Sequence, residues 1–325
     1  MHYVKDNIKK AVFRFRQFGG WRMLRAYTKV GVLPQLLQEV TRVMMQGRPL
    51  KEAYPAVSRR IVPILEEKYR PLAKELLQHY DDNGVEHQGC DVVWFCWLQG
   101  MEHAPELVNV CLASLKKYIK DKRFVCISLK NYQEYVKLDP HIEELYRKGI
   151  LPHAIFTDFL RLELLIKYGG TWIDSTVYCT GDDYPKQMMD CDLFFFQYLK
   201  NGYEGYVGIS NWFISAYSNN RLLTVLRDML LQYWRDYDCL IEYYVFHVFF
   251  RLIAEQCPGD VAAMPKISSN QAILMAQLLE KAYDEKIMIM LKSRSNFHKL
   301  DYRKSCCMTD EGMQTFYSHI ISNPV

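Results

Sequence analysis

The chain has 325 residues, of which half are hydrophobic and 24% are charged, with a formal net charge of +4. This composition is ample for a sizeable core and suits one large α/β domain with an appendage, or two small domains. It excludes a bilayer-spanning helix, because no apolar run reaches ~18 residues. From the charged N-terminus we expect no signal peptide. The ten cysteines form no Cys-x-x-Cys pair, so we expect reduced thiols in a cytosolic protein.

The N-terminal part of the chain is basic and has a helical pattern. Residues 1–80 hold 16 Lys and Arg against 6 Asp and Glu, while the remaining residues hold 25 against 31. Between Lys9 and Arg25, aromatic residues are mixed with cations, which is typical of a helix lying on an anionic membrane surface. A cationic helix packed on the rest of the protein is the alternative. A further helical stretch covers residues 61–77, where Pro63 and Pro71 mark turns or helix starts.

Residues 81–89 are polar and glycine-containing, which predicts a boundary. We therefore expect a basic helical region over residues 1–88 and an α/β domain over residues 89–325. Strands are predicted over 91–97 and 123–129, with a helix beginning at Pro105 between them, and this order fits a parallel βαβ unit. The later predicted elements are a helix over 155–168 with a strand to residue 173, strands over 193–197, 208–216 and 287–291, and helices over 220–235, 241–256 and 268–283.

The most informative stretch runs from residue 157 to residue 176. Asp158 and Arg161 lie one helical turn apart, so they can point into one pocket; an ordinary surface ion pair is the alternative. Gly169 stands where a helix end needs a left-handed residue. The following strand ends at Asp174, at the edge where open α/β sheets bind ligands. A carboxylate for a cation, an arginine for phosphate and a carboxylate for hydroxyls indicate a nucleotide-sugar site.

This stretch, T-D-F-L-R followed by G-G-T-W-I-D, resembles the S-D-x-x-R and G-G-x-x-x-D signature of family 32 glycosyltransferases with a D-x-D motif. The capsular polysaccharide synthesis branch, which is bacterial, resembles it most. Ordered blocks extend the resemblance over about residues 90–304, including V-V-W-F-C-W-L-Q-G, S-N-W-F-I-S-A and F-H-K-L-D-Y. It implies an α/β fold of the GT-A nucleotide-diphospho-sugar transferase type. In that fold a mixed, mainly parallel sheet is flanked by helices, here with a helical N-terminal appendage.

The resemblance also implies three catalytic residues. Asp174 anchors a divalent metal, Mn2+ or Mg2+, Asp158 accepts hydrogen bonds from ribose or sugar hydroxyls, and Arg161 contacts the diphosphate or the sugar. A second aspartate follows two positions after the first in the wider family. Here that position is Thr176, and a hydroxyl is a weak metal ligand.

Further donor-binding and metal-binding residues come from the other blocks. The resemblance places Trp94 on the nucleotide base, with a core tryptophan as the alternative, and Gln99 follows at the end of the same strand. In related folds a histidine such as His298 completes the metal shell and a lysine such as Lys299 holds phosphate. A loop histidine without a ligand is the alternative for His298. Asn211 and Trp212, on a predicted strand, are expected to line the sugar or acceptor pocket, with simple packing as the alternative. For His247, on a predicted apolar helix, the two alternatives are a core residue and a role at the acceptor.

The sequence therefore predicts a metal-dependent glycosyltransferase of the hexosyltransferase type. It would move a sugar from a nucleotide-sugar donor, by resemblance a UDP-sugar with retention of configuration, onto a surface or capsular glycan acceptor that can be lipid-linked. We expect a cytoplasmic protein, peripheral on the inner face of the membrane. Thr176 keeps open a non-catalytic nucleotide- or glycan-binding subunit of a polysaccharide assembly complex, and a sugar-phosphate transferase is a third alternative. No nucleic-acid motif accompanies the basic segment, so nucleic acid is not an expected partner.

Overall fold

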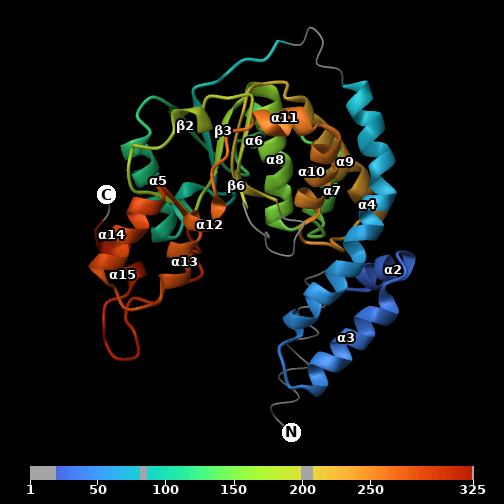
Figure 1. The fold of residues 1–325 in the computed structure, drawn as a ribbon, viewed down its shortest axis with the longest axis horizontal. Helices are drawn as coiled ribbons and strands as arrows, with labels where there is room; N and C mark the ends of the chain where they lie inside the picture. The colour runs from blue at the N-terminus through green and yellow to red at the C-terminus, as the bar shows by residue number, and fades with distance from the viewer. Residues whose placement is uncertain (1–19, 81–85, 199–207, 324–325) are drawn as a thin grey trace. The chain divides into compact units, whose positions relative to one another are not determined.

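The computed structural model describes residues 20–80, 86–198 and 208–323 (Figure 1). The predicted membrane-surface helix from Lys9 onward therefore lies largely outside the described residues. The chain divides into two units, the first made of residues 1–81, 138–159 and 225–257 and the second of residues 82–137, 160–224 and 258–325. The division into a region over residues 1–88 and a domain over residues 89–325 remains a prediction.

The first unit is helical. It holds α2 (Trp21–Lys29), α3 (Leu33–Met45), the 3-10 turn η1 (Leu50–Ala53), α4 (Tyr54–His79), α7 (Pro140–Arg147), α10 (Val245–Gln256), the beginning of α8 (His153–Tyr168) and most of α9 (Arg221–Tyr237). Of the predicted helices, the one over 155–168 is confirmed as α8, and those over 220–235 and 241–256 are confirmed as α9 and α10.

The prolines of α4 correct the sequence prediction. Pro63 and Pro71 lie inside this 26-residue helix and do not mark turns or starts. Both prolines are exposed, whereas buried residues recur every fourth position on the other side, at Ile61, Leu65, Tyr69 and Ala73. Each proline removes one backbone donor. The buried stripe, which packs on α10, holds the helix together despite that loss.

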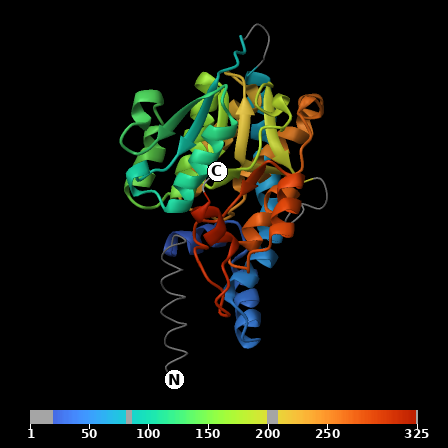
Figure 2. The same cartoon turned by 90° about the vertical axis from the view of Figure 1, so that its left-hand side faces the viewer.

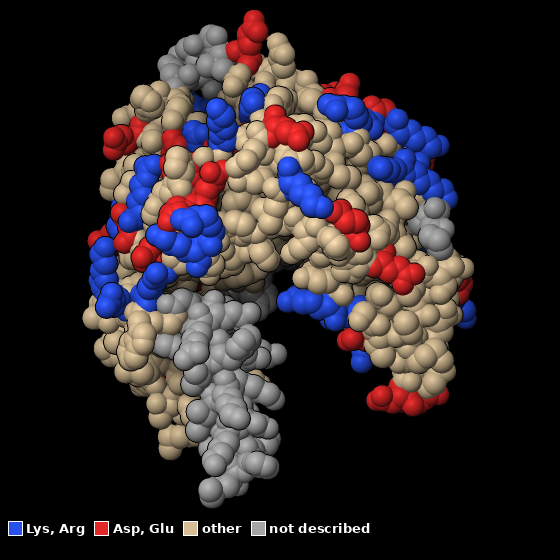
Figure 3. Space-filling view, turned by 180° about the vertical axis from the view of Figure 1, so that it is seen from behind, with Lys and Arg blue, Asp and Glu red and all other residues tan. Residues whose placement is uncertain are grey.

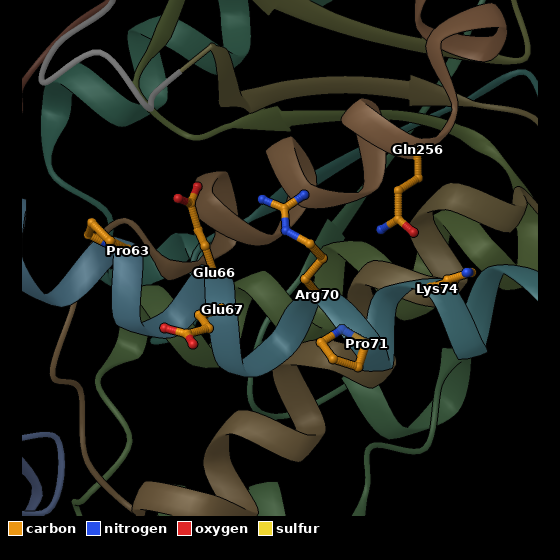
Figure 4. A pocket seen from close by; sticks show the side chains of 7 residues that line it. All are labelled: Pro63, Glu66, Glu67, Arg70, Pro71, Lys74 and Gln256. Atoms are coloured by element: carbon orange, nitrogen blue, oxygen red, sulfur yellow. The ribbon is translucent and has the colours of Figure 1, made fainter.

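A hollow lies on the first unit between the exposed side of α4 and the end of α10 (Figure 4). Two of its charged side chains are paired with neighbours of the same unit. Glu66 pairs with Arg251, and Arg70 Nη1 lies 2.7 Å from Glu255 Oε2. None of the residues predicted for the functional site lines it.

The second unit is built on a five-stranded sheet of order β2-β1-β3-β6-β5. The strands are β1 (Val92–Cys96), β2 (Arg123–Ile127), β3 (Gly170–Asp174), β5 (Leu193–Gln197) and β6 (Ile209–Ala216). β1 is parallel to β2 and β3, and β6 is antiparallel to both β3 and β5. The predicted mixed, mainly parallel sheet is confirmed, as are the strands over 91–97, 123–129, 193–197 and 208–216.

Successive side chains of a strand point to opposite faces of the sheet, and every residue of β1 is buried. Both faces of the sheet are therefore covered by helices. Val93 and Phe95 belong to a buried cluster that also contains Val108 and Leu115 of α5 (Glu106–Tyr118). Trp94, between them, faces the other way, toward Tyr168 at the end of α8, with ring centroids 5.5 Å apart. The end of α8 thus lies on the face opposite α5.

A smaller sheet and the C-terminal helices gather at the carboxyl ends of the parallel strands (Figure 2). The small sheet pairs β4 (Val177–Cys179) antiparallel with β7 (Phe297–Lys299). The remaining elements of this unit are the 3-10 turns η2 (Met101–His103) and η3 (Lys186–Met188), and α6 (Tyr132–Tyr135), α11 (Pro258–Ala263), α12 (Ser269–Ala272), α13 (Leu274–Leu278), α14 (Glu285–Arg294) and α15 (Phe316–Ser322).

Two predicted elements of this region are wrong. The strand over 287–291 is part of α14, which begins where the Asp284 carboxylate accepts a hydrogen bond from the Ile287 amide. Its buried residues, Met288 and Leu291, are three positions apart, a helical spacing that a short apolar run conceals. The helix over 268–283 is broken into α12 and α13 at Ile273.

All ten cysteines carry free thiols, in agreement with the prediction from their spacing. None of the described helices has both the length and the apolar character needed to cross a bilayer.

Candidate active site

The site begins at the glycine pair that joins α8 to β3. Gly169 and Gly170 have φ angles of +70° and +95°, in the region that favours glycine. A Cβ atom on Gly169 would lie 2.8 Å from the Ser218 amide nitrogen, and one on Gly170 would lie 2.6 Å from the Val92 carbonyl oxygen. Because neither residue has a side chain, the chain can turn here in close contact with neighbouring backbone and enter β3 next to β1.

Asp174 ends β3, and its Cα pairs with that of Cys96 at the end of β1. Its carboxylate is contacted on both oxygens. Oδ1 accepts a hydrogen bond from Trp172 Nε1 at 2.9 Å and lies 3.5 Å from Arg161 Nη2. Oδ2 lies 3.2 Å from Lys299 Nζ. One carboxylate is therefore held between two cations, and this group has a net charge of +1.

Arg161 reaches the site from α8, over the face of β3 opposite α5. Its guanidinium carbon lies 5.0 Å from the centre of a Trp172 ring, and Nη1 donates a hydrogen bond to the Asn211 carbonyl at 2.5 Å. Its side chain is only 6% exposed. These contacts fix the plane of the guanidinium. The pair of N–H groups that arginine offers to phosphate or carboxylate is therefore held in one orientation.

Lys299 reaches the site from a distant part of the sequence through the β4–β7 ladder. Lys299 pairs with Val177, and the Leu300 amide donates to the Thr176 carbonyl at 2.8 Å. This places Lys299 Nζ 2.5 Å from Thr176 Oγ1 as well as near Asp174. The Lys299 and Asp174 side chains are 26% and 25% exposed, so a ligand from solvent can reach both.

The electrostatics of the site keep Asp174 ionised. Burial opposes ionisation, but the Lys299 ammonium and the Arg161 guanidinium outweigh it and hold the pKa of Asp174 below its usual value. Beside it, burial raises the pKa of Cys96 to about 12, so this thiol is neutral at physiological pH. Asp174 therefore serves as a fixed anion that positions two cations, and Cys96 is a poor nucleophile.

The structure does not bring Trp94 and Trp212 to this group. Trp94 is 2% exposed, and its indole N–H donates to the Gly169 carbonyl at 2.9 Å, so it supports the glycine turn. Trp212 is 5% exposed and stacks on Phe196, with centroids 4.5 Å apart, in the core under α5. Gln99 is exposed in the turn after β1, at the same edge of the sheet as Asp174.

His298 points away from the Asp174 group. It neighbours Lys299 on β7, so the two side chains leave opposite sides of the strand. Its Nε2 lies 3.2 Å from Thr180 Oγ1, and burial lowers the pKa of His298 to about 4. His247 lies in α10 of the first unit and is 8% exposed. Asp158 lies one turn before Arg161 on α8 and is 6% exposed; by its contacts it belongs to the first unit.

An aromatic pair that the sequence analysis does not single out lies at the same sheet edge. Trp97 directly follows β1, and its ring lies edge-on to Tyr302, with centroids 5.3 Å apart. Tyr302 is 43% exposed and follows Lys299 by three residues. The feature that could have indicated Trp97 is its place at the end of the strand. A regular strand would point residues 94 and 97 in opposite directions, but β1 ends at Cys96, so Trp97 lies outside that alternation.

The side chains at Asp174 do not fit a resident divalent cation. Mg2+ and Mn2+ need several oxygen or imidazole ligands around one position. The described residues contain no group of three His, Cys, Asp or Glu side chains that could hold a metal ion. Asp174 Oδ2, the oxygen that a cation arriving with a diphosphate would need, is in contact with the Lys299 ammonium.

The fold and the site together define an α/β protein with a cationic, partly exposed group at the carboxyl edge of its sheet, where such sheets bind anionic ligands. Residues 45–320 match the family model described as capsular polysaccharide synthesis protein, and the chain belongs to this family. The resemblance that the sequence suggested is thereby confirmed.

No curated protein matches the chain significantly. A solved structure titled PaToxG Glycosyltransferase is similar at 15% sequence identity and a TM-score of 0.37, over 61% of this chain and 81% of that one.

Proposed function

We propose that this protein transfers a sugar from a nucleotide-sugar to a glycan acceptor during capsular polysaccharide synthesis. The observation that carries the proposal is the convergence of Arg161 and Lys299 on Asp174 at the carboxyl end of β3. Two cations fixed by one carboxylate suit a diphosphate, whose charge they partly neutralise. Membership of the capsular polysaccharide synthesis family supports the glycan acceptor.

The two cations have a defined task in this reaction. The bond between sugar C1 and the diphosphate oxygen breaks, and its electron pair stays on the diphosphate. An acceptor hydroxyl oxygen forms the new bond to C1, and its proton passes to the leaving diphosphate. Arg161 and Lys299 stabilise the charge that develops on the leaving group. Both Asp174 oxygens are engaged by donors, so Asp174 is a poor nucleophile, and a retaining transfer would proceed on one face of the sugar and not through a covalent glycosyl-enzyme.

The nucleotide is proposed to be a uridine diphosphate, with its base against Trp97 and Tyr302. This pair lies at the same sheet edge as Asp174, because Trp97 follows Cys96, the Cα partner of Asp174. Aromatic faces stack on bases with little preference among them, so the base is tested by experiment. The divalent cation stays a prediction of the family resemblance, because the described side chains around Asp174 form no site for it.

The test is a screen of nucleotide-sugars for release of free nucleoside diphosphate, with a lipid-linked or free glycan acceptor. A transferase releases the diphosphate and yields a product whose anomeric configuration nuclear magnetic resonance reads directly. A sugar-phosphate transferase would release the monophosphate instead. A non-catalytic subunit would bind a nucleotide, as thermal protection shows, but would release nothing from any donor.

The acceptor is further proposed to be lipid-linked, with the first unit resting on an anionic leaflet. Four apolar side chains on α2 and α3 are exposed, Trp21 by 75%, Leu37 by 57%, Met44 by 61% and Met45 by 84%. Residues 1–80 are basic by the count above. The face seen in Figure 3 shows Lys and Arg interspersed with Asp and Glu, so the apolar residues are the sharper feature to test.

The membrane test uses substitutions, because removing α2 would also remove Tyr27, which is buried in the first unit. Leu37→Glu with Met45→Glu should reduce binding to anionic vesicles, and Met290→Glu, at another exposed methionine, should not. High salt should weaken binding of the parent, since charges are screened over ~8 Å at physiological ionic strength. Equal binding to neutral vesicles would contradict the electrostatic part of the proposal.

A further inference from the structure

The position of Lys299 carries an inference that rests on the proposed function. Lys299 Nζ lies between Asp174 Oδ2 at 3.2 Å and Thr176 Oγ1 at 2.5 Å. These two side chains stand at the first and third positions of the D-x-D pattern, where a metal-binding site would offer two carboxylates. In this chain the third position is a hydroxyl, and an ammonium bridges it to the carboxylate.

We infer that the Lys299 ammonium, bridged between Asp174 and Thr176, takes the place of a divalent cation at the donor diphosphate. An ammonium has three N–H donors. Within the described residues, two are accounted for by Asp174 and Thr176, and the third can serve a phosphate oxygen of the donor. Nucleotide binding then depends on Lys299 and not on a metal ion.

The charge balance supports this assignment. With Thr176 at the third position, the group of Asp174, Arg161 and Lys299 has a net charge of +1, which attracts a diphosphate. With aspartate there, the group would be neutral and a divalent cation would be needed to restore the attraction. A divalent cation added to the present group would be repelled by the Arg161 and Lys299 cations. It would also have to displace the Lys299 ammonium from Asp174 Oδ2.

The backbone holds Lys299 in this position. Its strand is paired with β4, and the neighbouring Leu300 amide is bonded to the Thr176 carbonyl at 2.8 Å, so the lysine and threonine backbones are directly tied. Leu300 is 3% exposed in the cluster formed by α5 and the C-terminal helices. The ammonium is thus presented by packed structure, which lowers the entropic cost of holding it at the diphosphate.

The experiment measures binding of uridine diphosphate and of pyrophosphate by calorimetry, with EDTA or with added Mg2+ or Mn2+. The parent should bind both ligands in EDTA, and neither Mg2+ nor Mn2+ should tighten that binding. Lys299→Met should weaken binding about tenfold or more, as expected for loss of a charge-assisted contact, and added metal should not rescue it. Lys299→Arg should retain metal-independent binding. Lys286→Met, at an exposed lysine of α14, is the matched control and should bind like the parent.

A double variant gives the converse test. Thr176→Asp with Lys299→Ala replaces the ammonium by a second carboxylate, so binding of uridine diphosphate should become dependent on Mn2+. Circular dichroism checks that each variant is folded. Parent binding that is lost in EDTA and restored by Mn2+ would overturn the inference. Metal-independent binding without turnover of any donor would uphold it and refute the proposed transfer, and no binding in any condition would refute both.

Discussion

The buried histidine on β7 makes a quantitative prediction about stability and pH. His298 is fully buried, and burial lowers its pKa to about 4, whereas an unfolded chain gives ~6.5. Between these values the unfolded chain binds more protons than the folded one, so stability falls as the pH falls. The contribution is fully present above the unfolded pKa and is lost as the pH drops through 6.5 toward 4.

The magnitude follows from linkage. A fully expressed difference between the two pKa values corresponds to ~3 kcal/mol, and the part expressed between pH 7.5 and pH 5 is ~2 kcal/mol. Other groups also titrate in this range, so the quantity to compare is the difference between the parent and His298→Gln. A glutamine does not titrate and can still hydrogen-bond to Thr180.

Urea unfolding followed by circular dichroism at pH 7.5, 6 and 5 provides the assay. The free energy of unfolding of the parent should fall by ~2 kcal/mol more than that of His298→Gln over this range. His103→Gln, at an exposed histidine in η2, is the control and should retain the slope of the parent. Parallel curves for the parent and His298→Gln would refute the reasoning, because they would show that His298 is protonated equally in both states.

Three further predictions concern the site and its supports. Arg161→Lys should weaken uridine diphosphate binding about tenfold, because lysine keeps the charge but loses the fork, and calorimetry would show parent-like binding if the arginine did not contact phosphate. Gly170→Ala should destabilise the protein by ~2 kcal/mol or more in urea, since a Cβ there would meet the Val92 carbonyl. Gly312→Ala is the control, because its φ is also positive but the space around it is open, so it measures the backbone strain without the steric clash. Glu242→Gln should cost ~1–3 kcal/mol, because the buried carboxylate accepts hydrogen bonds from two hydroxyls and a backbone amide in the first unit, and an unchanged urea midpoint would contradict that role.

The local half of the site was predictable from the sequence. The glycine pair, the helix before it and the strand after it are set by neighbouring residues, and the observed positive φ angle of Gly169 agrees with the expected left-handed helix end. The meeting of Arg161 and Asp174 follows from the same stretch, because α8 returns over the strand that it precedes. Short-range signals of this kind are read directly from residue order.

The aromatic residues show where sequence reasoning fails. Trp94 and Trp97 have the same chemistry and lie three positions apart, and their roles depend on whether β1 continues past Cys96. The structure buries Trp94 behind the glycine turn and leaves Trp97 at the strand end beside Tyr302. Strand ends are among the least certain features of a sequence-based assignment, so the choice between the two required the three-dimensional structure.

The distant half of the site depends on pairing that no local signal reveals. Lys299 reaches Asp174 because β7 pairs with β4, although the two strands are more than a hundred residues apart in the sequence. The family-like block F-H-K-L-D-Y marked this segment, while the apolar run before it predicted a strand where α14 lies. The C-terminal helices bury Leu300 and Phe316 in one cluster with α5, so the packing of this region fixes β7. Without that packing, Asp174 would face Arg161 alone and the net positive charge of the group would be lost. The second cation of the site is therefore a product of the C-terminal fold, and the integrity of the site is coupled to the stability of that region.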